Sequence, residues 1–239
     1  MEDFTGIVNW ENVLKQSTAF KKNKPFKFAF IEEFFEKEFY EKLYQTFPAI
    51  DDKWVRSSVF HKNQFVRYWV DSEEGRAVVN KDEPYFSQEW NKFKRYVHTD
   101  EFINYFREFS GTPVTNLKYF HFVSYRKGGF QLPHIHNVGP STLIMMFYFS
   151  KNWKKGDPGG TYMAKKCDES SIIFEPHNLD NSMAIFLDGP KSAHGVRYIS
   201  KDVERKALQV TLEEYSLKTG WSGGNPKITG KLLPNQIHS

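Results

Sequence analysis

The spacing of apolar residues divides the chain into a helical first half and a second half made of strands. From Ile31 to Phe47, aromatic and aliphatic residues recur every three or four positions among Glu and Lys, and Pro48 follows. This period predicts an amphipathic helix that ends at the proline. The same period over 87–109 predicts a second helical stretch, which the Ser-Gly-Thr-Pro sequence at 110–113 ends.

Beyond residue 113 the chain consists of short runs rich in Tyr, Phe, Val and Ile, separated by Gly, Pro, Asn and Asp. The run 141–149 is apolar on both faces, which indicates a strand covered on both sides. Further strands are predicted at 116–125, 161–164, 171–174, 182–187 and 206–212. One more strand, at 65–70, is predicted between the two helical stretches. Many short strands with such punctuation favour a sandwich or barrel, and we expect a mainly β fold with flanking helices.

We interpret the 239 residues as one domain with three parts. Residues 1–112 form a helical region that packs on the core, 113–217 form the β core, and 218–239 form a loosely attached tail. Aromatic residues make up 17% of the chain, which is far from the composition of a disordered protein.

Charge and cysteine content exclude several classes of protein. The net charge of +4 and pI of about 8.9 permit a nucleic-acid partner but do not indicate one, and no recognition motif accompanies them. The single cysteine, Cys167, excludes an intrachain disulfide and a cysteine-based zinc site. The acidic start of the chain and the lack of any long apolar run predict a cytoplasmic protein without a membrane span.

Three histidines carry the candidate chemistry. His134 and His136 are separated by one residue, and on an extended strand such residues project from the same face. They can therefore bind one metal ion from a single element, and His194 would complete one face of the ion. An open facial site suits a redox metal that binds a co-substrate and dioxygen. A His-X-His pair alone is weak evidence, because such pairs also occur on ordinary polar strand faces.

Several short sequence motifs, which follow one another in a fixed order, strengthen this interpretation. They are Tyr125 with Gly128 and Gly129, then Pro133-His134, Phe147–Trp153, Gly159-Gly160-Thr161, Phe174-Glu175-Pro176, Ala184-Ile185-Phe186, His194-Gly195-Val196 and Arg205–Leu208. In this order the stretch from Tyr119 to Leu212 resembles the core of the Fe(II)- and 2-oxoglutarate-dependent oxygenases, specifically the prolyl 4-hydroxylase-like branch. The resemblance implies a double-stranded β-helix, which is a jelly roll flanked by helices.

The resemblance also implies functions for individual residues. His134 and His194 would bind Fe(II), and Arg205 would pair with the distal carboxylate of 2-oxoglutarate, a task suited to its planar fork. The Tyr148 hydroxyl would help to hold that carboxylate, and Tyr125 would lie on the same side of the pocket. Strand alternation favours Arg205 over its neighbour Lys206, because Arg205 shares a face with polar residues.

His136 departs from the family pattern, which has Asp at this position. Imidazole is an acceptable iron ligand, so His136 remains a candidate third ligand. The resemblance implies a dioxygenase that uses Fe(II), 2-oxoglutarate and O₂ and releases succinate. We expect it to hydroxylate an amino-acid-type substrate, free or in a peptide, with a prolyl residue among the candidates. The segment 55–75 is a candidate lid or substrate surface.

Two other functions stay open at this point. The missing carboxylate is compatible with a non-catalytic or degenerate jelly roll that binds a metal without turning over 2-oxoglutarate. A nucleic-acid-binding module, which the basic pI permits, ranks third.

Overall fold

The structure, a computed structural model, describes residues 2–69, 80–136 and 139–222. The helices are α1 (Trp10–Lys15), α2 (Ser17–Lys22), α3 (Lys37–Gln45), α4 (Gln88–Tyr96) and α5 (Asp100–Ser110). The strands are β1 (Phe28–Glu32), β2 (Val55–Val59), β3 (Lys62–Tyr68), β4 (Asn116–Tyr125), β5 (Phe130–His134), β6 (Thr142–Phe149), β7 (Tyr162–Ala164), β8 (Ile172–Phe174), β9 (Asp180–Leu187), β10 (His194–Val196), β11 (Arg205–Glu213), β12 (Tyr215–Ser216) and β13 (Gly220–Trp221).

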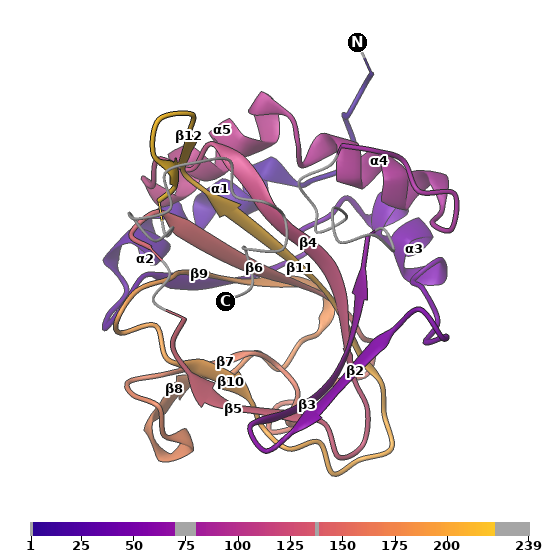
Figure 1. The fold of residues 1–239 in the computed structure, drawn as a ribbon, viewed down its shortest axis with the longest axis vertical. Coiled ribbons are helices and arrows are strands. Elements are labelled where there is room, and N and C mark those ends of the chain that lie inside the picture. The colour runs from indigo at the N-terminus through magenta and orange to yellow at the C-terminus, as the bar shows by residue number, and fades with distance from the viewer. Residues whose placement is uncertain (1, 70–79, 137–138, 223–239) are drawn as a thin grey trace.

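Eleven of these strands form one curled antiparallel sheet in the order β1-β9-β6-β11-β4-β3-β5-β10-β7-β8, with β2 paired to β3. Figure 1 shows two layers: β4, β6, β9 and β11 form the larger one, and β5, β7, β8 and β10 form the smaller one. Strand β3 joins them, because Phe65–Tyr68 pair with β4 whereas Lys62 and Asn63 pair with β5. The predicted jelly roll with flanking helices is therefore confirmed.

The two faces of the larger layer have different surroundings. On its outer face, Phe147 packs against Phe34 from the N-terminal region, with ring centroids 4.7 Å apart. Helices α1 to α5 lie on this side of the sheet (Figure 1). The inner face presents Tyr125, Tyr148 and Ala207, which face the smaller layer within a second apolar cluster. Strand alternation thus separates residues that hold the fold together from residues that face the interior of the roll.

The predicted helices are shorter than their apolar patterns. Residues 28–32 form strand β1, which pairs with β9, so the helix predicted from Ile31 begins only at Lys37. The stretch 87–109 contains two helices rather than one. Its break is at Thr99, whose side chain accepts a hydrogen bond from the backbone N–H of Phe102 and caps α5.

The strands after residue 113 agree closely with the predicted runs. Strand β4 covers 116–125 as predicted, and β6, β7, β8, β9 and β11 each lie within one or two residues of their predicted bounds. Helix α5 ends at Ser110 and is capped by Gly111, whose φ of 66° lies in the left-handed region that favours glycine. The predicted tail lies outside the described residues from 223 onward, as does the part of the candidate lid from 70 to 75.

No helix in the described ranges is both long enough and apolar enough to cross a membrane.

Candidate metal centre

The three predicted histidines come together at one point. His134 is the last residue of β5 and His194 is the first of β10, and the two are partners in the antiparallel register. His136 follows β5 by two residues, and its Nε2 atom lies 3.0 Å from the Nε2 atom of His134. One nitrogen from each ring lies within 4.8 Å of the others. The three side chains are therefore placed so that they could bind one metal ion.

Backbone carbonyl groups fix the orientation of two of these rings. The Nδ1 atom of His134 lies 3.0 Å from the carbonyl oxygen of Leu132, and that of His194 lies 2.7 Å from the carbonyl oxygen of Ser192. A carbonyl oxygen only accepts, so each Nδ1 donates its proton and each Nε2 keeps a lone pair. In metal sites, this kind of outer hydrogen bond sets the tautomer that binds the metal.

Desolvation lowers the pKa of all three imidazoles. The pKa of His134 falls to about 4, because its ring is desolvated and lies beside His136. Burial and the two neighbouring rings hold the pKa of His194 well below its ordinary value. The side chain of His136 reaches the surface, but the groups packed around its ring partly desolvate it and lower its pKa, although the charge of Asp188 opposes this effect. All three rings are therefore neutral near pH 7, which is the form that binds a metal.

Asp188 is a buried carboxylate near this site that the sequence analysis did not find. Its side chain is 3% exposed, and its Oδ1 atom accepts a hydrogen bond of 2.9 Å from the Ser192 hydroxyl. The carbonyl group of the same Ser192 holds the ring of His194. Asp188 thus supports the turn before His194 and places a negative charge close to His136, the position where the family pattern has a carboxylate.

Arg205 lies fully buried on the inner face of β11. Its Nε atom donates to the carbonyl oxygen of Gly159 at 2.9 Å, and its Nη2 atom donates to Thr161 Oγ1 at 3.0 Å. Its Nη1 atom is buried and has no hydrogen-bond partner among the described residues. A buried guanidinium nitrogen without a partner is costly, so this geometry fits an anionic group of a bound ligand.

The rings of two tyrosines, Tyr125 and Tyr148, lie close to Arg205. The Arg205 guanidinium carbon is 5.0 Å from the ring centre of Tyr125 and 4.9 Å from that of Tyr148. The Tyr148 hydroxyl accepts a hydrogen bond of 3.0 Å from the backbone N–H of Thr161. Burial raises the pKa of Tyr125, so its hydroxyl stays protonated and available as a donor.

Gln131 links the arginine to the histidines, and sequence reasoning missed it. The Tyr125 hydroxyl lies 2.6 Å from Gln64 Oε1 and 3.0 Å from Gln131 Oε1. The Nε2 atom of Gln131 lies 3.3 Å from the Nε2 atom of His134. A continuous series of contacts thus joins Arg205 to the three histidines. Strand alternation does not reveal Gln131, because it precedes His134 by three residues and would point to the opposite face of a regular strand. An irregularity in the register of β5 with β10 lies between the two residues.

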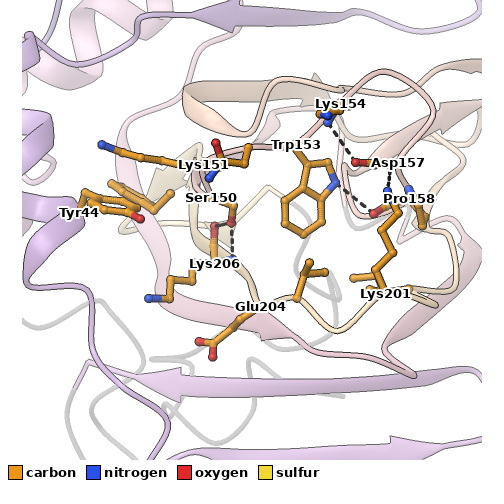
Figure 2. A pocket seen from close by; sticks show the side chains of 14 residues that line it. Tyr44, Ser150, Lys151, Trp153, Lys154, Asp157, Pro158, Lys201, Glu204 and Lys206 are labelled. Atoms are coloured by element: carbon orange, nitrogen blue, oxygen red, sulfur yellow. Dashed lines mark hydrogen bonds and ion pairs between the residues drawn. The ribbon is translucent and has the colours of Figure 1, made fainter.

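A separate pocket lies outside the roll, between the loop after β6 and the start of β11 (Figure 2). It has a volume of about 500 Å³, and none of the three histidines lines it. Lys151 and Lys201 at its rim are paired with Glu41 and Asp157, so these charges are already compensated. The indole of Trp153 projects into this region in Figure 2 and packs closely against Gly159. Trp153 thus packs on the segment whose Gly159 carbonyl group accepts a hydrogen bond from Arg205.

No protein-family model matches the chain, and no curated protein is detectably similar to it in sequence. Solved structures do match. The prolyl-4-hydroxylase of Pseudomonas putida has a TM-score of 0.58 at 12% identity, and the match covers 82% of this chain and 98% of that one. A prolyl hydroxylase from Trichoplax adhaerens, solved with a peptide of hypoxia inducible factor, has a TM-score of 0.56 at 15% identity, with coverages of 85% and 88%.

HygX from Streptomyces hygroscopicus, solved with nickel and 2-oxoglutarate bound, has a TM-score of 0.54 at 12% identity, and the match covers 83% of this chain and 85% of that one. At such identities, similarity establishes the fold alone. The chain therefore has the fold of the 2-oxoglutarate and iron oxygenase structures, prolyl hydroxylases among them, and the resemblance predicted from the order of its motifs is confirmed at the level of the fold.

Proposed function

We propose that this protein is an Fe(II)- and 2-oxoglutarate-dependent dioxygenase that hydroxylates an amino-acid-type substrate, free or peptidyl, including prolyl. One observation carries the proposal: three neutral imidazoles converge next to a buried arginine that lacks a partner for one nitrogen. Contacts through Tyr125 and Gln131 connect the two groups. A metal ion and an anionic co-substrate can therefore be held side by side.

The residues present fit both groups. Imidazole nitrogens are good ligands for Fe(II), and three of them on one face leave the remaining positions to the co-substrate and dioxygen. Arg205 and the hydroxyl groups of Thr161 and Tyr148 suit the distal carboxylate of 2-oxoglutarate. The doubly negative co-substrate would also offset the two positive charges of the metal, which three neutral imidazoles leave uncompensated.

When bound, Fe(II) and 2-oxoglutarate together supply the oxidation of a substrate C–H bond by dioxygen, with succinate and carbon dioxide as products. The residues of the chain position and shield this chemistry. The carbonyl groups of Leu132 and Ser192 hold His134 and His194 in the tautomer that binds the metal. Phe186 packs 4.5 Å from the ring of His194 and provides an apolar wall there.

The hairpin of β2 and β3 supports a substrate surface beside the metal centre. The backbone N–H of Leu132, two residues before His134, donates to the carbonyl oxygen of His61 in this hairpin. Phe60 at its tip is 88% exposed, and Leu132 itself is 42% exposed. Large exposed apolar side chains at the entrance of a site suit contact with a substrate. The peptide bound to the Trichoplax structure makes a peptidyl substrate one of the possibilities.

The exchange of the usual Asp for His136 favours one alternative, a jelly roll that binds a metal without turning over 2-oxoglutarate. The two proposals differ in what happens when the co-substrate is added. The first requires 2-oxoglutarate to bind directly to the iron, whereas the second does not.

The experiment is an anaerobic titration of the protein with Fe(II), followed by 2-oxoglutarate, while the visible charge-transfer band of the bidentate complex is monitored. We expect the band in the wild type and its loss in His194→Ala. His177→Ala, which removes an exposed histidine outside the cluster, is the matched control and should retain it. Bound iron without a band would contradict the dioxygenase proposal and favour the alternative.

A further inference from the structure

A positively charged side chain lies on the inner face of the roll next to the three histidines. Residues of β3 alternate, and Gln64 and Tyr68 point inward, because Gln64 accepts a hydrogen bond from Tyr125 and the ring of Tyr68 lies 5.9 Å from that of His121. Lys62 shares this face. Its register partner is Gln131, whose side chain contacts His134.

Lys62 therefore lies one residue away from the candidate metal ligands. It is half-buried, and Gln131 is the residue that stands between it and His134. No described carboxylate forms an ion pair with Lys62. A half-buried ammonium group in this position would gain from an anionic partner.

The balance of charges around the histidines also favours an anionic group on the substrate. Around the histidines, Lys62 and Arg205 are positive and Asp188 is negative, and the metal adds two positive charges. A bound 2-oxoglutarate brings two negative charges, which leaves one positive charge in excess. In the usual site the carboxylate ligand would remove it, but here His136 occupies that position. One additional carboxylate would neutralise the centre.

Polar residues continue this wall on β4 and β11. His121 and Gln209 are register partners and share a hydrogen bond, and Gln209 Nε2 lies 3.4 Å from Thr211 Oγ1. Buried polar side chains are costly unless they are hydrogen-bonded, and these contacts supply that pairing. The inner face is therefore polar here, which suits a small polar substrate bound at Lys62.

We propose that Lys62 binds a carboxylate group of the substrate, so that the substrate is a small carboxylic acid such as a free amino acid, rather than an internal residue of a peptide. This inference rests on the proposed function and narrows its substrate class. An internal peptide residue has no carboxylate on its backbone, whereas a free amino acid always does.

The test uses the anaerobic Fe(II) and 2-oxoglutarate complex of the full chain. The twenty free L-amino acids are added separately, and each is compared with its carboxamide and with an acetylated, amidated form that mimics an internal residue. Binding close to the iron changes the charge-transfer band without any turnover. We expect at least one free acid to change the band, and its carboxamide and capped form to have no effect at the same concentration.

Substitutions of Lys62 then assign the contact. Lys62→Gln should weaken binding of that acid by about 10-fold or more, because a charge-assisted hydrogen bond is lost, and Lys62→Arg should largely restore it. The affinity for 2-oxoglutarate should not change. Lys206→Gln is the matched control, since Lys206 is a half-buried strand lysine on the opposite face of the sheet. Thermal unfolding checks that each variant is folded.

The outcomes separate the two proposals. Failure of the band to form in the wild type overturns the proposed function and this inference with it. A normal band overturns the inference alone if no free acid changes it, if a carboxamide or capped form binds as well as the acid, or if Lys62→Gln has no effect. Weaker binding of 2-oxoglutarate in Lys62→Gln also overturns it, because Lys62 would then contact the co-substrate.

Discussion

His134 and His194 lie directly opposite each other on the antiparallel strands β5 and β10, with ring centroids 4.3 Å apart. Each ring donates its Nδ1 proton to the carbonyl group two residues earlier in the chain. The two strands are distant in sequence, yet each carries one histidine with the same Nδ1 hydrogen bond, and the two rings meet at one point. The sheet register, rather than a flexible loop, sets the distance between these two candidate ligands.

Removing His194 should therefore abolish tight metal binding. We expect His194→Ala to lower the affinity for Fe(II) by about 100-fold or more, since losing even an outer partner of a ligand costs about 10- to 100-fold. Anaerobic titration with Fe(II) and a competing chelator measures the effect. Unchanged affinity would mean that His194 does not bind the metal.

Replacing His136 with aspartate should restore the usual ligand set. The His136→Asp variant should retain Fe(II) and show equal or greater turnover of 2-oxoglutarate, because a carboxylate compensates one charge of the metal. Succinate formation measures turnover. His136 is exposed and lies beyond the end of β5, so we expect the variant to fold. Loss of folding would show that this segment is assigned incorrectly.

Arg205 should be required for binding the co-substrate but not the metal. In the wild type, the planar guanidinium of Arg205 contacts Gly159 and Thr161 and still has Nη1 available for a ligand. The Arg205→Lys variant keeps the positive charge but loses this planar group. We expect 2-oxoglutarate to bind about 10- to 100-fold more weakly, which corresponds to about 1.5–3 kcal/mol for a hydrogen bond to a charged group. The strength of the charge-transfer band against 2-oxoglutarate concentration measures this. The exposed Arg126→Lys is the control, and equal losses in both variants would contradict the assignment.

The sequence predicted those parts of the fold that depend on local patterns. Strand β4 could be predicted because ten consecutive residues rich in Tyr, Phe and Val precede a turn. Strand β1 could not, because its sequence resembles the start of the helix that follows and its partner β9 lies about 150 residues away. The break between α4 and α5 lies at Thr99, whose side chain caps α5. The spacing of apolar residues gives no sign of this break.

The residues of the candidate site likewise divide into those that local motifs predict and those that only tertiary contacts place there. His134, His136, His194 and Arg205 could be predicted because each belongs to a short motif in a recognisable order. Lys62, Gln131 and Asp188 could not be found in this way, since what places them near the histidines is the pairing of β3 with β5 and the turn after β9. Residues that support a site are determined by tertiary contacts more than by local sequence.

Replacing Gly195 even with alanine, which adds only a methyl group, should destabilise the protein. A Cβ atom at this position would lie 2.4 Å from the Tyr162 hydroxyl and 2.6 Å from the carbonyl oxygen of Gln131, so β10 could not keep its place between β5 and β7. We expect Gly195→Ala to lower the free energy of unfolding by about 1–3 kcal/mol and to weaken metal binding. At Gly189 a Cβ atom would meet nothing within 4 Å, so Gly189→Ala is the matched control. Denaturant unfolding compares the two, and equal stabilities would contradict the predicted clash.

The stability of the metal-free protein should fall as the pH is lowered from about 6.5 to about 4. Burial lowers the pKa of His121 and His134 to about 4, whereas a histidine in the unfolded chain has a pKa near 6.5. Between these values the unfolded chain binds protons that the folded protein does not, so protonation favours unfolding and the stabilisation is lost toward acid pH. Denaturant unfolding in a chelator at a series of pH values measures the slope. His121→Gln should reduce the slope and the exposed His177→Gln should not, and a slope unchanged in His121→Gln would show that this ring titrates normally in the folded state.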